Sequence, residues 1–152
     1  MKLKDTISLE HITILKSTSK EAALLELIAL IEKSGKVQDI SALKESIFYR
    51  EKLMSTGIGC GIAVPHVRLQ GVAEPFILIG VCYKGIDDYE SLDNQPVRIG
   101  VMIIAGKEQH REYIQLLSEI ISHLKNKEFT ESLIQCDTVG TIHSLIMEKC
   151  DD

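Results

Sequence analysis

Apolar residues recur at helical spacing in the first and last thirds of the chain and form nearly continuous runs in the middle third. The spacing predicts helices over about residues 19–34, 40–52, 108–125, 129–134 and 138–149, each with an inward-facing apolar stripe. Thr18 and Glu21 have the spacing of a capping box before the first helix, and Gly35 is typical of its end. In the helix over residues 108–125, the predicted inward stripe is Ile114, Leu117, Ile121 and Leu124.

The apolar runs of the middle third predict strands over residues 62–64, 76–83 and 97–105, the latter two buried on both faces. Residues 12–15 are a candidate edge strand. Helices followed by strands and then by helices predict an α/β fold, in which a mixed β-sheet is flanked by helices on both faces. No repeat or Pro/Ser-rich linker divides the sequence, so we expect residues 1–152 to form a single domain.

Composition narrows the possible partners. The chain is 45% hydrophobic, which suffices for a packed core, and its formal net charge is −5. A nucleic-acid partner is disfavoured because there is no basic run, aromatic residues make up only 5%, and Trp is absent. The longest apolar run is much shorter than the roughly 20 residues of a membrane-spanning helix, so no direct membrane insertion is expected. The widely spaced cysteines read as reduced thiols and predict a cytoplasmic protein.

The stretch over residues 49–66 concentrates the candidate chemistry. Gly57, Gly59 and Gly61 alternate before a short strand, and the pair Pro65–His66 follows that strand. Glycine reaches backbone angles that other residues avoid and lets another group approach the main chain. A histidine just beyond a strand end would face solvent from a rigid base.

Four interpretations of this stretch are open from the residues alone. A nucleotide-phosphate loop fits poorly, because the spacing is G-x-G-x-G and leads into a strand rather than a helix. Cys60 and His66 could be metal ligands, although they are only two, or Cys60 could be a nucleophile paired with His66, although no orienting partner is evident. The default is a glycine-rich turn followed by a surface histidine.

Residues 50–66, followed by Arg68, closely resemble a family signature, R-E-x-x-x-S-T-G-I-G-x-G-I-A-[IV]-P-H. That signature is typical of the enzyme IIA domains of the bacterial phosphoenolpyruvate-dependent phosphotransferase system, in the fructose–mannitol class and its nitrogen-regulatory branch. The resemblance continues through residues 93–97 and 112–120 and covers about residues 5–148. It identifies the chain as an enzyme IIA-like phosphotransferase domain.

The resemblance implies that His66 accepts a phosphoryl group from the phosphocarrier protein HPr or its nitrogen-branch equivalent. Arg50 would stabilise the phosphate, and backbone N–H groups of Ser55, Thr56, Gly57 and Gly59 would add donors. The step would be a stoichiometric phosphohistidine transfer that requires no metal, nucleotide or other cofactor.

The next partner would be a sugar permease's IIB component, as in sugar transport, or a regulatory target protein. The charge of −5 and residues 93–97 resemble the nitrogen-regulatory branch more. The alternative is a degenerate, non-phosphorylated regulatory binding module.

The chain departs from the family pattern at one position. Relatives often carry a second histidine where this chain has Tyr113, which can donate a hydrogen bond but cannot carry a positive charge. His110, three residues earlier, is a possible auxiliary residue together with Tyr113. Val67 follows His66 where many relatives have a smaller residue, which could narrow access. The remaining histidines have no motif context and are expected to be structural: His11, His123 and His143.

Overall fold

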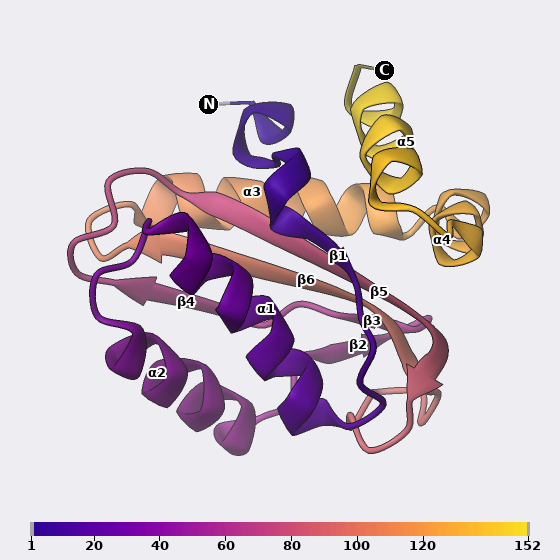
Figure 1. Ribbon diagram of the computed structural model, residues 1–152, viewed down its shortest axis with the longest axis horizontal. Helices are drawn as coiled ribbons and strands as arrows, with labels where there is room; N and C mark the ends of the chain where they lie inside the picture. The colour runs from indigo at the N-terminus through magenta and orange to yellow at the C-terminus, as the bar shows by residue number, and fades with distance from the viewer. Residues whose placement is uncertain (1, 152) are drawn as a thin grey trace.

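The computed structural model describes residues 2–151 and places a six-stranded sheet between two layers of helices (Figure 1). In chain order the elements are η1 (Leu3–Thr6), η2 (Leu9–His11), β1 (Ile12–Ile14), α1 (Lys20–Ser34), α2 (Ile40–Leu53), β2 (Gly57–Gly59), β3 (Ile62–Ala63), β4 (His66–Leu69), β5 (Phe76–Ile86), β6 (Val97–Gly106), α3 (His110–Leu124), α4 (Lys127–Gln135) and α5 (Val139–Asp151).

The sheet is mixed, as predicted, and is built around the antiparallel pair of β5 and β6. The strand order is β1-β5-β6-β3-β2, and β4 also pairs with β6. β1 runs parallel to β5, β3 and β4 run parallel to β6, and β2 is antiparallel to β3. β1 lies at the edge of the sheet, which confirms the candidate edge strand.

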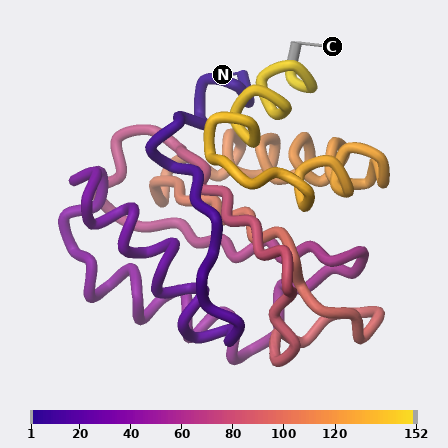
Figure 2. The backbone as a smooth tube through the Cα atoms, turned by 45° about the vertical axis from the view of Figure 1, so that its right-hand side comes forward, coloured from indigo at the N-terminus to yellow at the C-terminus, as the bar shows by residue number. Residues whose placement is uncertain are grey.

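Alternate side chains of the two central strands face opposite layers, as the period of a strand requires. Leu78 and Met102 belong to the hydrophobic cluster that contains the inner faces of α1 and α2. Ile77 and Val101 belong to the cluster that contains those of α3, α4 and α5. Figure 2 shows α1 and α2 on one side of the sheet and α3 to α5 on the other. Both faces are therefore covered, which confirms the predicted architecture.

β3 and β4 follow one line along the same edge of β6. Ala63 pairs with Gly100 and His66 pairs with Ile103, so the register is the same on both sides of Pro65. Pro65 has no N–H and interrupts the ladder, although its carbonyl still accepts a hydrogen bond from the Ile103 amide at 3.0 Å. His66 was predicted to follow the last residue of a strand; in the structure it also opens β4, which the sequence pattern did not indicate.

The helices were predicted correctly in number and approximate position, but two details were wrong. The N-cap of α1 is Ser19 rather than Thr18, because the Ser19 hydroxyl accepts the Ala22 amide at 3.3 Å. The inward stripe of α3 is shifted by one position: its buried side chains are Tyr113, Leu116, Ile120 and Leu124, whereas Ile114 is 46% exposed. Two neighbouring apolar rows share this helix, and the row that begins with the aromatic ring faces the sheet. Within residues 2–151, no helix has both the length and the apolar character needed to cross a bilayer.

His11 is a buried histidine at the junction of η2 with α1, α5 and β5. Its ring packs against Phe76 with 5.4 Å between centroids, and neither ring nitrogen has a hydrogen-bond partner among the described residues. Burial is the main cause that lowers the pKa of His11; the positive charge of Lys36 lowers it further, and Glu10 opposes the shift. The folded state therefore favours the neutral ring.

We expect His11 to make the fold sensitive to mild acid. Its pKa in the folded chain lies below the ordinary value of 6.5, so below that pH the unfolded chain binds more protons and stability falls. Replacing His11 by Leu removes this contribution and flattens the decline in the free energy of unfolding between about pH 6.5 and 5. Urea unfolding of both proteins at several pH values measures the difference. An unchanged slope in His11→Leu would show that His11 is not the titrating group.

Candidate functional site

His66 lies at the start of β4, half-buried, with one ring nitrogen tied to the backbone. Nδ1 lies 2.6 Å from the carbonyl oxygen of Val64. A carbonyl can only accept, so Nδ1 carries the proton and donates it, and in the neutral ring Nε2 keeps its lone pair. The pKa of His66 is lowered mainly by burial and also by Arg50, while the Val64 hydrogen bond and the Glu51 charge raise it. The ring is thus a neutral base with a free nucleophilic nitrogen near pH 7.

Tyr113 packs against His66 from α3. The two ring centroids are 5.4 Å apart and the planes are tilted by 52°. The guanidinium carbon of Arg68 lies 6.0 Å from the centre of the Tyr113 ring, and Arg68 Nη1 donates to the Lys107 carbonyl at 3.1 Å. Burial raises the pKa of Tyr113 to about 12, although Arg50 and Arg68 oppose the shift. The phenol therefore stays neutral and acts as a hydrogen-bond donor.

Arg50 stands in the last turn of α2 and is partly buried. Its Nη1 donates to the carbonyl of Met54 at 2.8 Å, which caps the end of the helix. Its positive charge lowers the pKa of both His66 and Tyr113, which places the guanidinium within electrostatic reach of both rings. Several N–H donors of the guanidinium remain beyond the one that Met54 uses.

A buried polar cluster surrounds Glu51, the residue that follows Arg50 in α2. The Glu51 carboxylate accepts the Thr56 amide at 3.1 Å and also the Thr56 hydroxyl, and it pairs with Lys20 Nζ at 3.3 Å. Tyr89 lies 2.9 Å from the Thr56 hydroxyl, and Lys20 Nζ lies 4.5 Å from the centre of its ring. These residues come from α1, α2, the link that leads into β2 and the β5–β6 connection, so the cluster joins four segments of the chain.

The glycine-rich loop is packed closely against the β5–β6 connection. A Cβ on Gly57 would lie 2.2 Å from the carbonyl oxygen of Glu90, so only glycine fits there. Two predicted phosphate donors in this loop have internal partners: the Thr56 amide donates to Glu51, and the Gly57 amide donates to the Ser55 hydroxyl at 3.3 Å. Gly59 has a positive φ of 99°. Phosphate binding by the backbone of Ser55, Thr56, Gly57 and Gly59 stays a prediction.

The structure brings together some predicted site residues and separates others. The His66 and Tyr113 rings pack together and the charge of Arg50 acts on both, whereas His110 is an exposed residue at the start of α3, and its auxiliary role stays a prediction. Sequence reasoning did not assign roles to Arg68 or Glu51, although both belong to the stretch that carries the family signature. Lys20 and Tyr89 had no local signal, because they reach the cluster from distant segments.

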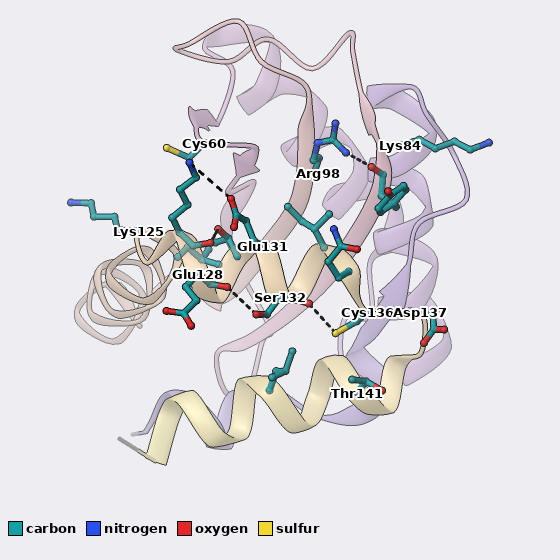
Figure 3. A pocket seen from close by; sticks show the side chains of 17 residues that line it. Cys60, Lys84, Arg98, Lys125, Glu128, Glu131, Ser132, Cys136, Asp137 and Thr141 are labelled. Atoms are coloured by element: carbon teal, nitrogen blue, oxygen red, sulfur yellow. Dashed lines mark hydrogen bonds and ion pairs between the residues drawn. The ribbon is translucent and has the colours of Figure 1, made fainter.

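A groove of about 1300 Å³ lies elsewhere, between α4 and the ends of β5 and β6 (Figure 3). Cys60 and Arg98 line it, and the Arg98 amide donates to the carbonyl of Gly61 at 2.7 Å. Arg98 precedes Ile103, the strand partner of His66, by about 16 Å along β6. Pairing of Cys60 with His66, as metal ligands or as nucleophile and base, therefore receives no support from the fold.

A neutral, anchored imidazole beside guanidinium groups defines a nucleophilic site suited to an anionic group. Comparison with known proteins agrees with that class. Residues 5–149 match the family described as "Phosphoenolpyruvate-dependent sugar phosphotransferase system, EIIA 2". The chain belongs to this family, as the sequence resemblance indicated.

Relatives of two kinds are similar to the chain. One is the "PTS system fructose-specific EIIABC component" of Bacillus subtilis, 36% identical over 143 residues, which are 94% of this chain. The chain spans only 22% of the length of that protein. Another is a "Nitrogen regulatory protein" of Bradyrhizobium diazoefficiens, 31% identical over 148 residues, which are 96% of this chain and 95% of the relative.

Solved structures share the fold. The nitrogen regulatory protein IIA-Ntr from Neisseria meningitidis has a TM-score of 0.85 at 24% identity, over 95% of this chain and 98% of the other. Enzyme IIA for mannitol from Escherichia coli, solved in complex with phosphorylated enzyme IIB, has a TM-score of 0.73 at 24% identity, over 93% and 97% of the two chains.

We expect the unphosphorylated His66 ring to be found as the Nδ1–H tautomer, with a pKa below the ordinary 6.5 because burial disfavours the charged form. Replacing Arg50 by Met removes a nearby positive charge and raises that pKa relative to the wild type. Nitrogen-15 NMR of the imidazole as a function of pH measures both properties. A predominant Nε2–H tautomer, or a pKa at or above 6.5 in the wild type, would contradict the geometry described here.

Proposed function

We propose that this chain is a phosphocarrier that accepts a phosphoryl group on Nε2 of His66 from the phosphohistidine of HPr or a nitrogen-branch equivalent. The single observation that carries the proposal is the hydrogen bond from Nδ1 to the Val64 carbonyl, which leaves Nε2 as the nucleophile. Family membership supports a role in a phosphotransferase system.

In the proposed step the lone pair of Nε2 attacks phosphorus while the N–P bond of the donor breaks. The donor nitrogen recovers its electron pair, and no proton has to leave His66 because Nε2 carries none. Nδ1 keeps its proton and its bond to Val64 throughout. A loose transition state of this kind needs alignment and charge stabilisation above all. Arg50 offers donors to the equatorial oxygens, and the Tyr113 phenol offers one more.

The surface beside Arg50 suits a protein donor. Tyr49, Leu53 and Met54 are large apolar side chains exposed around the end of α2, on either side of Arg50 in sequence. Exposed apolar groups rimmed by charge are typical of protein docking surfaces. We propose that HPr docks here, and that a IIB component or a regulatory target uses phosphorylated His66 next.

The next partner would be a transport protein if this chain shares the role of the fructose-specific relative, and a regulatory protein if it shares that of the nitrogen regulatory relative. The curated relatives carry both kinds of name, one fructose-specific and one nitrogen regulatory. The mannitol enzyme IIA structure was solved with its phosphorylated IIB partner, which supports a IIB component as one acceptor. The alternative, a binding module that is never phosphorylated, is motivated by Tyr113 in place of a second histidine.

Incubation with phosphoenolpyruvate, enzyme I and HPr tests the proposal. We expect one acid-labile phosphoryl group per chain, which is lost in His66→Ala and retained in His143→Ala, whose histidine lies away from the site on α5. Adding a cognate IIB protein should then discharge the label if the chain serves transport. Label that persists in His66→Ala would refute the assignment, and absence of label in the wild type would favour the binding module.

Arg50→Ala is expected to slow phosphorylation of His66 about 100-fold, the loss typical when one preorganised charge-stabilising donor is removed. Stability should fall by only about 1 kcal/mol, because the bond lost to Met54 is an exposed one. Arg50→Lys should recover part of the rate, since it keeps the charge but lacks the planar fork. Phosphorylation kinetics and thermal unfolding of the same preparations separate the two effects. Parallel losses of rate and stability would mark Arg50 as structural.

A further inference from the structure

We propose that Glu51 is a positioning residue for phosphoryl transfer, which holds His66 and Arg50 in one geometry through the buried cluster around Thr56. The inference rests on the proposed function, because it concerns the rate of the step at His66. It adds a residue that touches neither the phosphoryl group nor the donor.

Glu51 is fixed more firmly than any exposed carboxylate could be. Its side chain is 3% exposed and is held by the Thr56 amide, the Thr56 hydroxyl and Lys20. The Tyr89 hydroxyl and the Lys20–Tyr89 contact close the cluster on its remaining side. A buried carboxylate with this many donors is locked in place, because losing any one of them would leave a desolvated oxygen.

Three hydrogen bonds, linked through the backbones of Thr56 and Val64, lead from Glu51 to the His66 imidazole. Glu51 holds the amide side of Thr56, and the Thr56 carbonyl accepts the Val64 amide at 3.0 Å. The Val64 carbonyl in turn accepts His66 Nδ1–H at 2.6 Å. Glu51 thus acts on the direction in which Nε2 points through the backbone of Val64, whose amide is bound to Thr56 and whose carbonyl is bound to His66.

The Glu51 carboxylate also fixes the helix end that carries Arg50. Arg50 is its neighbour in the last turn of α2, so anchoring Glu51 to the β2 segment anchors the helix end that presents the guanidinium. Glu51 also acts on His66 directly, since its negative charge raises the pKa of His66 against the effects of burial and Arg50. One side chain thus anchors the segments that carry His66 and Arg50 and adds a negative charge near the His66 ring.

The chain contains a matched control for these contacts. Glu90 also pairs with Lys20, at 3.1 Å, but its side chain is 69% exposed, and the Thr56 amide and hydroxyl bond to Glu51 instead. Glu90→Gln therefore removes a negative charge and a Lys20 partner without disturbing the hydrogen bonds that lead to His66. If Glu51 acted through its charge alone, Glu51→Gln and Glu90→Gln should have similar effects. If Glu51 positions the site, only Glu51→Gln should impair the transfer.

The test compares Glu51→Gln, Glu90→Gln and the wild type in phosphorylation by phospho-HPr, with thermal unfolding and imidazole nitrogen-15 spectra of each protein. We expect Glu51→Gln to lower the maximal rate about 10- to 100-fold, as loss of a supporting contact does in other sites. The HPr concentration for half-maximal rate should stay unchanged, because the buried Glu51 cannot contact HPr. The His66 spectrum should shift away from a pure Nδ1–H tautomer, whereas Glu90→Gln should match the wild type in all three.

A second pair of variants keeps the test decisive if Glu51→Gln does not fold. Thr56→Val removes the hydroxyl that donates to Glu51 with little change of volume, and should slow the transfer; Thr56→Ser restores the hydroxyl and should recover the rate. Unchanged rates and spectra in Glu51→Gln or Thr56→Val, with a wild type that is labelled normally, would overturn the positioning role alone. A wild type that takes no label would instead overturn the proposed function.

Discussion

The site depends on a local interruption of the sheet. β3 and β4 keep one register along β6, but Pro65 between them has no amide to place in the ladder. At this break the Val64 carbonyl accepts a hydrogen bond from Nδ1–H of the His66 ring at 2.6 Å. An imidazole anchored in this way has one nitrogen committed to the backbone and one free, and it stands on the edge of a strand whose neighbour is fully buried. The bond to Val64, beside a proline that interrupts the ladder, therefore leaves Nε2 as the nitrogen available for the proposed transfer.

The charges around the imidazole come from guanidinium groups. At the position where the family resemblance implies a second histidine, this chain has Tyr113, whose pKa is raised to about 12 by burial and which stays neutral. The positive charge that acts on His66 then comes from Arg50, while Arg68 lies over the Tyr113 ring at 6.0 Å; a guanidinium, unlike an imidazole, is a permanent cation in proteins. A phosphoryl group would add about −1.5 to −2 charges at pH 7. The electrostatic support for that group should vary less with pH than support from a second imidazole would.

Much of this arrangement could be predicted from the sequence, and the failures have physical causes. The hydrophobic pattern identified the long helices, because each buries one regular face, and the two central strands, because both of their faces are buried and their apolar runs are nearly continuous. It missed β2 and β4, which are too short and too rich in glycine or polar residues to show a period of two. It predicted an inward face of α3 that is shifted by one residue, because Tyr113 was considered as a candidate site residue and not as a core residue. The signature around residues 50–66 indicated His66 and Arg50, but the partners of Glu51 could not be predicted, since Lys20 and Tyr89 meet it only in the folded chain.

The most direct test of the central claim is the position of the phosphoryl group on the ring. Phosphorylation of nitrogen-15-labelled protein, followed by nitrogen–phosphorus coupling measurements, assigns the phosphorylated atom without mutation. We expect phosphorus bonded to Nε2 of His66, with the Nδ1 proton still present and slow to exchange because it remains bound to Val64. Phosphorus on Nδ1, or on a different histidine, would contradict the account.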